Sequence, residues 1–127
     1  MKILLDTHAF LWFLSDNDKL SQGTRKVLEN SNNDIFISIA SFWEISIKLS
    51  LSKLILDIPF ELLFDEAKDL NIQILHINKE HLMILKELPF HHKDPFDRLL
   101  IAQSIQENLT IVTADSYFKS YSVKTLW

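Results

Sequence analysis

The sequence predicts an α/β fold, a three-layer α/β/α sandwich built on a mostly parallel central sheet. Three observations lead to this prediction. Short apolar runs, typical of strands buried on both faces, alternate with longer stretches whose apolar residues recur at helical spacing. The chain has 127 residues, 47% of them hydrophobic, so it can bury a sizeable core. No internal repeat or linker interrupts the pattern, so we expect residues 1–127 to form a single domain.

Five apolar runs are the expected strands. They are residues 2–5, 35–38, 72–77, 109–112 and 123–126. The expected helices are residues 8–14, 21–30, 41–49, 59–70, 78–88 and 94–108, with a short helical turn at 116–119. Because strands and helices alternate, right-handed crossovers would place helices on both faces of the sheet.

Residues that favour helix starts support several of these boundaries. Ser21 and Asn78 are suitable N-caps for the helices that follow them. Pro59 suits the first turn of a helix. Asp94 is followed directly by Pro95, a combination typical of a helix start.

Composition excludes several classes of protein. The formal net charge of −4 argues against a protein that holds nucleic acid through clustered Lys and Arg, although metal ions on carboxylates could still receive a phosphate. The absence of Cys excludes disulfides and thiolate metal sites and is typical of a reducing cytoplasm. No apolar run reaches the roughly 18 residues of a membrane span, and the first residues lack a signal-peptide cleavage site. We therefore expect a cytoplasmic protein with no membrane partner.

Four acidic residues lie next to element boundaries: Asp6, Glu44, Asp97 and Asp115. Asp6 ends the first strand, Glu44 lies in the first turn after the second strand, and Asp115 follows the fourth strand. Because ligand sites in parallel α/β sheets form beyond the carboxyl ends of the strands, these three should meet at one edge. Asp97 opens the helix that leads into the fourth strand. We expect that helix to start at the opposite edge unless it is set back or tilted.

Converging carboxylates would need a cation. Two like charges about 4 Å apart repel by roughly 4 kcal/mol at an effective dielectric constant near 20, and several such pairs exceed what a marginally stable fold tolerates. Either the pKa values rise or a divalent ion neutralises the site. All-oxygen ligands favour Mg²⁺ or Mn²⁺ over zinc, and a hard ion in an acidic cleft is typical of phosphoryl chemistry.

Most of these acids also have a purely structural explanation. Ser41 and Glu44 are three residues apart and fit a capping box at the start of their helix. Asp94 and Asp115 can be ordinary helix caps. Asp6 is harder to explain in this way, because it closes an apolar strand. The set of acids is therefore more informative than any one of them.

Four segments of the sequence carry a more specific pattern: LDTH at 5–8 with FLW at 10–12, SIASFWEI at 38–45, HKDPFDRLLIAQ at 92–103 and TAD at 113–115. In these segments the chain resembles the PIN-domain family, specifically the VapC-like toxins of prokaryotic toxin–antitoxin pairs. The segments occur in the family's order and spacing, and the resemblance spans nearly the whole chain.

The resemblance implies a fold in which acidic residues at a parallel sheet bind Mg²⁺ or Mn²⁺, with the Asp97 position in the same pocket. The residues that match the metal-site acids are Asp6, Glu44, Asp97 and Asp115. The residues that match accessory positions are Asp94, Thr7 and Thr113. The implied activity is endoribonuclease cleavage of RNA by a metal-activated water, leaving 5′-phosphate and 3′-hydroxyl ends. The implied partners are a cognate antitoxin that covers the site and a second copy of the chain in a homodimer.

Basic and apolar residues suggest further contacts. The candidates for binding RNA phosphates are Lys48, His92, Lys93 and Arg98. Lys48 lies one turn beyond Glu44, so an ion pair between residues i and i+4 explains it as well. An apolar stripe would form a groove for an antitoxin helix where it is exposed. Its residues are Phe60, Leu63 and Phe64, with Leu49, Leu51 and Leu54.

Other functions explain the sequence less well. A non-catalytic PIN relative that binds RNA or protein is expected to lack an acid, and all four are present. A receiver-like phosphoacceptor domain would have paired acids near the first strand, and a phosphatase of the Asp-x-Asp type would have a second Asp at position 8. Asp6 has no acidic neighbour, and position 8 is His8.

Overall fold

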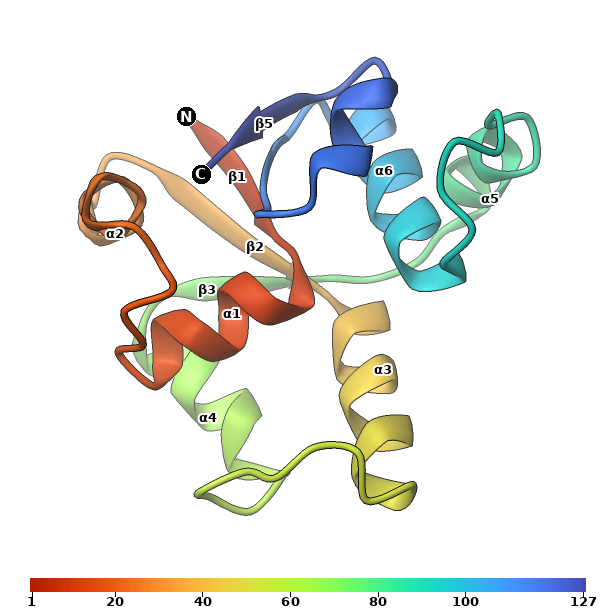
Figure 1. Cartoon of the computed structure of the whole chain (residues 1–127). Helices are drawn as coiled ribbons and strands as arrows, with labels where there is room; N and C mark the ends of the chain where they lie inside the picture. The colour runs from red at the N-terminus through yellow and green to blue at the C-terminus, as the bar shows by residue number, and fades with distance from the viewer.

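The computed structural model describes residues 1–127 and contains one five-stranded sheet in which every pair of neighbouring strands is parallel (Figure 1). The strand order is β3-β2-β1-β4-β5. The strands are β1 (Lys2–Leu5), β2 (Asp34–Ser38), β3 (Ile72–Leu75), β4 (Thr110–Val112) and β5 (Lys124–Leu126). The predicted α/β class is confirmed, and each strand overlaps the apolar run that predicted it.

Six α-helices and one 3₁₀ helix connect the strands. They are α1 (Thr7–Leu14), α2 (Gln22–Glu29), α3 (Ile39–Ser50), α4 (Leu62–Asp69), α5 (Lys79–Leu85), α6 (Pro95–Glu107) and the 3₁₀ helix η1 (Ser116–Ser120). None of these helices is both long enough and apolar enough to cross a lipid bilayer.

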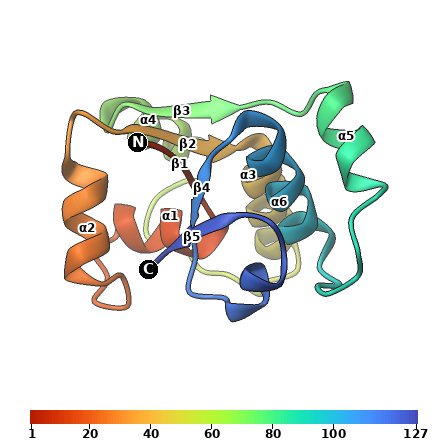
Figure 2. The same ribbon diagram turned by 90° about the horizontal axis from the view of Figure 1, so that it is seen from above.

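Alternating side chains of the sheet divide the interior into two cores. Ile3 and Leu5 of β1 point into a core that receives side chains from α1, α2, α3 and α4. Leu4, between them, points into the opposite core, which is built largely from α6 and η1. Figure 2 accordingly shows α6 and α5 on the other side of the strands from α2. These are the three layers that the sequence predicts, because successive strand residues face opposite sides of a sheet.

The helix after β2 begins earlier than predicted. Ser38, the last residue of β2, is the N-cap, and its hydroxyl accepts a hydrogen bond from the Ala40 N–H at 3.1 Å. Ser41 is therefore inside the helix, and its Oγ lies 3.0 Å from Thr7 Oγ1. The predicted capping box between Ser41 and Glu44 is wrong, and Glu44 lies in the second turn of α3.

The helix predicted from Pro59 also begins later, at Leu62. Residues 59–61 form a turn, in which Pro59 and Phe60 accept backbone hydrogen bonds from Leu62 and Leu63 at 3.0 Å each. No side chain caps this helix. In contrast, Asn78 is the N-cap of α5, as the sequence predicts, and it forms a full capping box.

The first turn of α6 lies at the carboxyl edge of the sheet, which corrects our expectation for Asp97. A helix that leads into a parallel strand runs back across the sheet, from the carboxyl edge to the amino edge. Its start therefore lies near the end of the strand that follows it. Asp97 in the first turn of α6 and Asp115 just after β4 both contact His92. No tilt of the helix is needed to explain this placement.

Candidate functional site

Three of the acids cap helices at the carboxyl edge. Asp6 follows β1 and accepts a hydrogen bond from the Ala9 N–H at 2.8 Å as the N-cap of α1. Asp115 caps η1 through the Tyr117 N–H at 2.9 Å. Asp94 caps α6 through the backbone N–H groups of two residues in its first turn. The capping explanation is therefore correct for Asp94 and Asp115, but it uses only one carboxylate oxygen of each residue.

Asp6 lies deep between β1 and β4. Its backbone N–H donates to the Val112 carbonyl at 3.1 Å, and the residue is only 7% exposed. Burial raises the pKa of Asp6 above its ordinary value, and the charge of Glu44 adds to that rise. Hydrogen bonds from the Thr113 hydroxyl and the Ala9 N–H lower the pKa without cancelling the effect of burial. A buried carboxyl of this kind accepts a bound cation readily, because the cation stabilises its ionised form.

Glu44 reaches the same edge from α3. Its Oε1 accepts a hydrogen bond of 2.6 Å from the Thr7 hydroxyl, and its Oε2 pairs with Lys48 Nζ at 3.0 Å. The i,i+4 ion pair that the sequence suggested for Lys48 is therefore present. The Thr7 hydroxyl sits at the first residue of α1, next to Asp6, and so links the end of β1 to α3.

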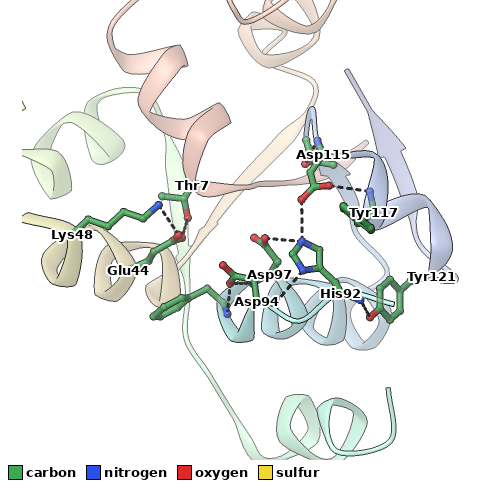
Figure 3. A network of polar contacts seen from close by, with 11 residues as sticks. Thr7, Glu44, Lys48, His92, Asp94, Asp97, Asp115, Tyr117 and Tyr121 are labelled. Atoms are coloured by element: carbon green, nitrogen blue, oxygen red, sulfur yellow. Dashed lines mark hydrogen bonds and ion pairs between the residues drawn. The ribbon is translucent and has the colours of Figure 1, made fainter. Parts of the chain in front are cut away.

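Asp97 is where the charges of this edge are most crowded. Burial is the largest cause of a rise in the pKa of Asp97 from 3.8 to about 7, and the negative charges of Asp94, Glu44 and Asp6 add to it. His92 acts in the opposite direction and lowers the pKa. Figure 3 shows Asp97 between Glu44 on one side and His92 with Asp115 on the other.

His92 contacts two of the acids, which lie on different elements of the fold. Its Nε2 lies 3.0 Å from Asp97 Oδ2 and 2.9 Å from Asp115 Oδ2 (Figure 3). The sequence suggests His92 only as a phosphate contact, and nothing in the local sequence indicates that it contacts two carboxylates. The contact depends on a loop whose path is set by residues distant in the sequence.

The remaining basic candidates lie in different surroundings. Lys93 is exposed. Arg98 is 6% exposed and donates to the backbone carbonyls of Pro89 at 2.8 Å and Leu88 at 3.2 Å. Its guanidinium also stacks on Phe90, with Cζ 4.0 Å from the ring centroid. Arg98 does not fit a phosphate contact, because its donors are already bound to the chain. Its position in the first turn of α6 gave no indication of this inward orientation.

The donor set of this edge fits a hard divalent cation. Asp6, Glu44 and Asp97 lie within electrostatic reach of one another, and the basic side chains of Lys48 and His92 contact this group of acids. The ligand atoms of His92, Asp97 and Asp115 lie within 4.8 Å of one another. Oxygen-rich sets of this kind suit Mg²⁺ or Mn²⁺.

Comparisons with known proteins identify the family of this fold. The family model of the PIN domain matches residues 3–124. The solved structures that are similar in fold include VapBC2 from Rickettsia felis bound to a DNA fragment from its promoter, with 20% identity and a TM-score of 0.73 over 99% of this chain and 98% of that chain. VapBC-1 from nontypeable Haemophilus influenzae is similar at 14% identity, with a TM-score of 0.67 over 99% and 97% of the two chains.

A toxin–antitoxin complex from Klebsiella pneumoniae is similar at 16% identity, with a TM-score of 0.62 over 98% of this chain and 96% of that chain. No curated protein matches the chain. At these identities the solved structures establish a shared fold, and the family model establishes which family the fold represents.

Proposed function

We propose, from the premise that this chain belongs to the PIN-domain family, that it is a metal-dependent endoribonuclease and the toxin of a toxin–antitoxin pair. One observation carries the proposal. Asp6 after β1, Glu44 on α3 and Asp97 on α6 meet at one edge of the sheet, and burial and the charges of Asp94, Glu44 and Asp6 raise the pKa of Asp97 to about 7. Crowding of this kind costs stability, and a bound cation would offset the repulsion.

The residues that would hold the ion are Asp6, Glu44, Asp97 and Asp115. When bound, Mg²⁺ or Mn²⁺ polarises a phosphate oxygen and lowers the pKa of a water that attacks phosphorus. Thr7 orients Glu44 through its 2.6 Å hydrogen bond, and Thr113 donates to Asp6. Asp94 holds the first turn of α6, from which Asp97 projects.

Lys48 is the best placed candidate for a phosphate contact. It is half-buried, and its Nζ lies beside the acids through its ion pair with Glu44. Lys93 remains a candidate on the exposed loop before α6. A phosphate that approaches this edge of the sheet would contact the ammonium group of Lys48 in an otherwise negative region. That contact would position the RNA without distinguishing its base sequence.

An antitoxin is the protein partner that we propose. The Klebsiella pneumoniae structure is described as a toxin–antitoxin complex, which supports the same kind of partner here. A hollow of about 400 Å³ lies between α1 and residues 54–58, with Leu11, Trp12 and Leu54 in its lining. Leu54 belongs to the stripe that the sequence suggested for an antitoxin helix, whereas Leu63 of that stripe is mostly buried in the core. A homodimer and a cytoplasmic location stay predictions.

An RNA cleavage assay tests the proposal. We expect purified protein to cut RNA with Mg²⁺ or Mn²⁺, to lose activity in EDTA, and to lose it in Asp6→Asn. Asp34→Asn is the matched control, because Asp34 is an exposed carboxylate at the opposite end of the neighbouring strand β2. Cleavage that survives chelation, or survives Asp6→Asn, would reject the mechanism. Metal binding without cleavage would favour a non-catalytic PIN domain that binds RNA or protein.

A further inference from the structure

We infer that His92 is a positioning residue, which donates its Nε2–H to Asp115 with Asp97 beside the same nitrogen, and stays outside the set of metal ligands. The inference rests on the proposed metal site and goes beyond it, because it assigns a role to a side chain that the acids alone do not explain. The nearness of His92, Asp97 and Asp115 would by itself suit an imidazole ligand equally well.

The hydrogen bond at Nδ1 of the ring distinguishes a positioning residue from a metal ligand. His92 Nδ1 lies 3.1 Å from the backbone nitrogen of Asp94, whose N–H can only donate. Nδ1 must therefore offer its lone pair. A neutral imidazole carries one proton, so that proton is on Nε2. A nitrogen that carries a proton has no lone pair for a metal ion, and Nε2 is the atom that faces the acids.

The Nε2–H group lies between two carboxylate oxygens. Nε2 is hydrogen-bonded to Asp115 Oδ2 at 2.9 Å and lies 3.0 Å from Asp97 Oδ2, so one ring nitrogen contacts an acid after β4 and an acid on α6. Oδ1 of Asp115 is occupied by the Tyr117 N–H. Both oxygens of Asp115 are thus held before any ion arrives, as outer hydrogen bonds do for ligands in metal sites, and Asp97 is kept beside it by its contact with the same nitrogen.

The loop that carries His92 is built to hold this ring in place. The Tyr121 hydroxyl accepts a hydrogen bond from the His92 backbone N–H at 2.8 Å and donates to the Pro89 carbonyl at 2.7 Å. Arg98 donates to the same carbonyl. The ring packs against Phe118 with centroids 5.8 Å apart. Turning the imidazole to present a free nitrogen would break its hydrogen bond with the Asp94 N–H and its packing against Phe118. The bond from the buried Arg98 to the Pro89 carbonyl gives Arg98 a role in positioning the loop.

The tautomer can be measured directly by two-bond ¹H–¹⁵N NMR of the histidine rings. We expect His92 to carry its proton on Nε2 in the metal-free protein and to keep it there in saturating Mg²⁺. A proton on Nδ1, a doubly protonated ring, or a proton that leaves Nε2 when Mg²⁺ is added would overturn the inference. This readout needs no RNA cleavage, so it can fail or succeed whether or not the protein is a nuclease.

Variants test the positioning role. We expect His92→Ala to weaken Mn²⁺ binding, measured by calorimetry, by about 10- to 100-fold, the usual effect of losing an outer hydrogen bond to a metal ligand. His92→Gln should recover most of that loss, because its side-chain amide can donate but its nitrogen does not ligate metals. His91→Gln is the matched control on the exposed neighbour. Equal loss in His92→Gln and His92→Ala would indicate a ligand, and no loss in either would remove the positioning role.

Discussion

Two histidines beside α6 make the same pair of hydrogen bonds in very different surroundings. His81 Nδ1 lies 3.2 Å from the Asn78 backbone nitrogen, and its Nε2 lies 2.9 Å from Glu107 Oε2. His92 likewise has a backbone N–H at Nδ1 and carboxylate oxygens at Nε2. His81 is fully buried and has one carboxylate partner, at the last residue of the helix. His92 is half-buried and has two, near the first turn.

The comparison shows that a histidine–carboxylate contact does not by itself mark a functional site. The Glu107 side chain is 37% exposed. Asp97 is surrounded by other carboxylates, and its pKa is raised to about 7. The crowding of acids, which costs stability, distinguishes the two ends of α6. The following predictions test that distinction, from the largest expected effect to the smallest.

Neutralising the carboxylate at each end of α6 should separate the two roles most clearly. We expect Asp97→Asn to reduce metal-dependent RNA cleavage by at least about 100-fold, roughly 2.7 kcal/mol in activation free energy, because an ion ligand is lost. Glu107→Gln should leave cleavage unchanged. Initial rates in Mg²⁺ and in Mn²⁺ are the measurement. Equal losses in the two variants would mean that the acids at the first turn have no special role.

Replacing each histidine should give the opposite ranking of the two ends of α6 when stability, and not RNA cleavage, is measured. We expect His81→Ala to lower the free energy of unfolding by about 2–3 kcal/mol, because it opens a fully buried space and removes the capping box of α5. His92→Ala should cost less, because its ring is partly exposed. Urea unfolding of the metal-free variants gives both values. A larger loss in His92→Ala would show that the loop before α6 contributes more to the free energy of unfolding than the buried His81 does.

The stability of the metal-free protein should depend on pH through Asp97. The pKa of Asp97 is about 7 in the folded protein and near 3.8 in the unfolded chain, so between these values the folded state holds a proton that the unfolded state has lost. Unfolding then releases a proton, and stability falls as the pH rises. From about pH 5 to about pH 8 we expect a loss on the order of 2 kcal/mol, reduced by solvent screening of a partly exposed side chain.

Unfolding curves at a series of pH values check this prediction. Asp97→Asn should reduce the slope, because it removes one of two acids whose pKa is raised, and Asp6 is the other. Saturating Mg²⁺ at high pH should restore stability, since an ion replaces the missing proton and binds only the folded state. Glu107→Gln, at the other end of the helix, is the control and should leave the slope unchanged. An unchanged slope in Asp97→Asn would assign the effect to another group.

Local chemistry explains what could be predicted from the sequence. The five strands and the caps Ser21, Asn78 and Asp94 follow from apolar runs and from side chains that bond to backbone within three residues. Ser38 and Ser41 show where this approach fails. Both are followed by helix, and only the contact between Ser41 and Thr7, 34 residues apart, shows which one is inside it. Local patterns cannot choose between two serines that both lie near the start of a helix.

The candidate site likewise has a part that local sequence suggests and a part that it does not. The sequence suggests the four acids because it places each beside an expected element boundary, although Glu44 lies in the second turn of α3. The role of His92 could not be identified in this way, because its position depends on Tyr121, which is 29 residues later in the sequence, and on the buried Arg98. From the sequence, Arg98 is expected to be an exposed basic residue of a helix. Only the path of the preceding loop shows that its guanidinium points inward.

The smallest predicted effect concerns a hydroxyl in the buried half of α6. Ser104 Oγ is buried without a hydrogen-bond partner, three residues before Glu107 and well removed from the acids of the first turn. Replacing it with Ala removes an unpaired polar atom and adds a better helix former, so Ser104→Ala should be neutral or raise the free energy of unfolding by up to about 1 kcal/mol. Urea unfolding measures the change, and Mn²⁺ affinity should stay at the wild-type value. A clear destabilisation would mean that the hydroxyl is paired in solution, and a change in Mn²⁺ affinity would mean that the two ends of α6 are coupled.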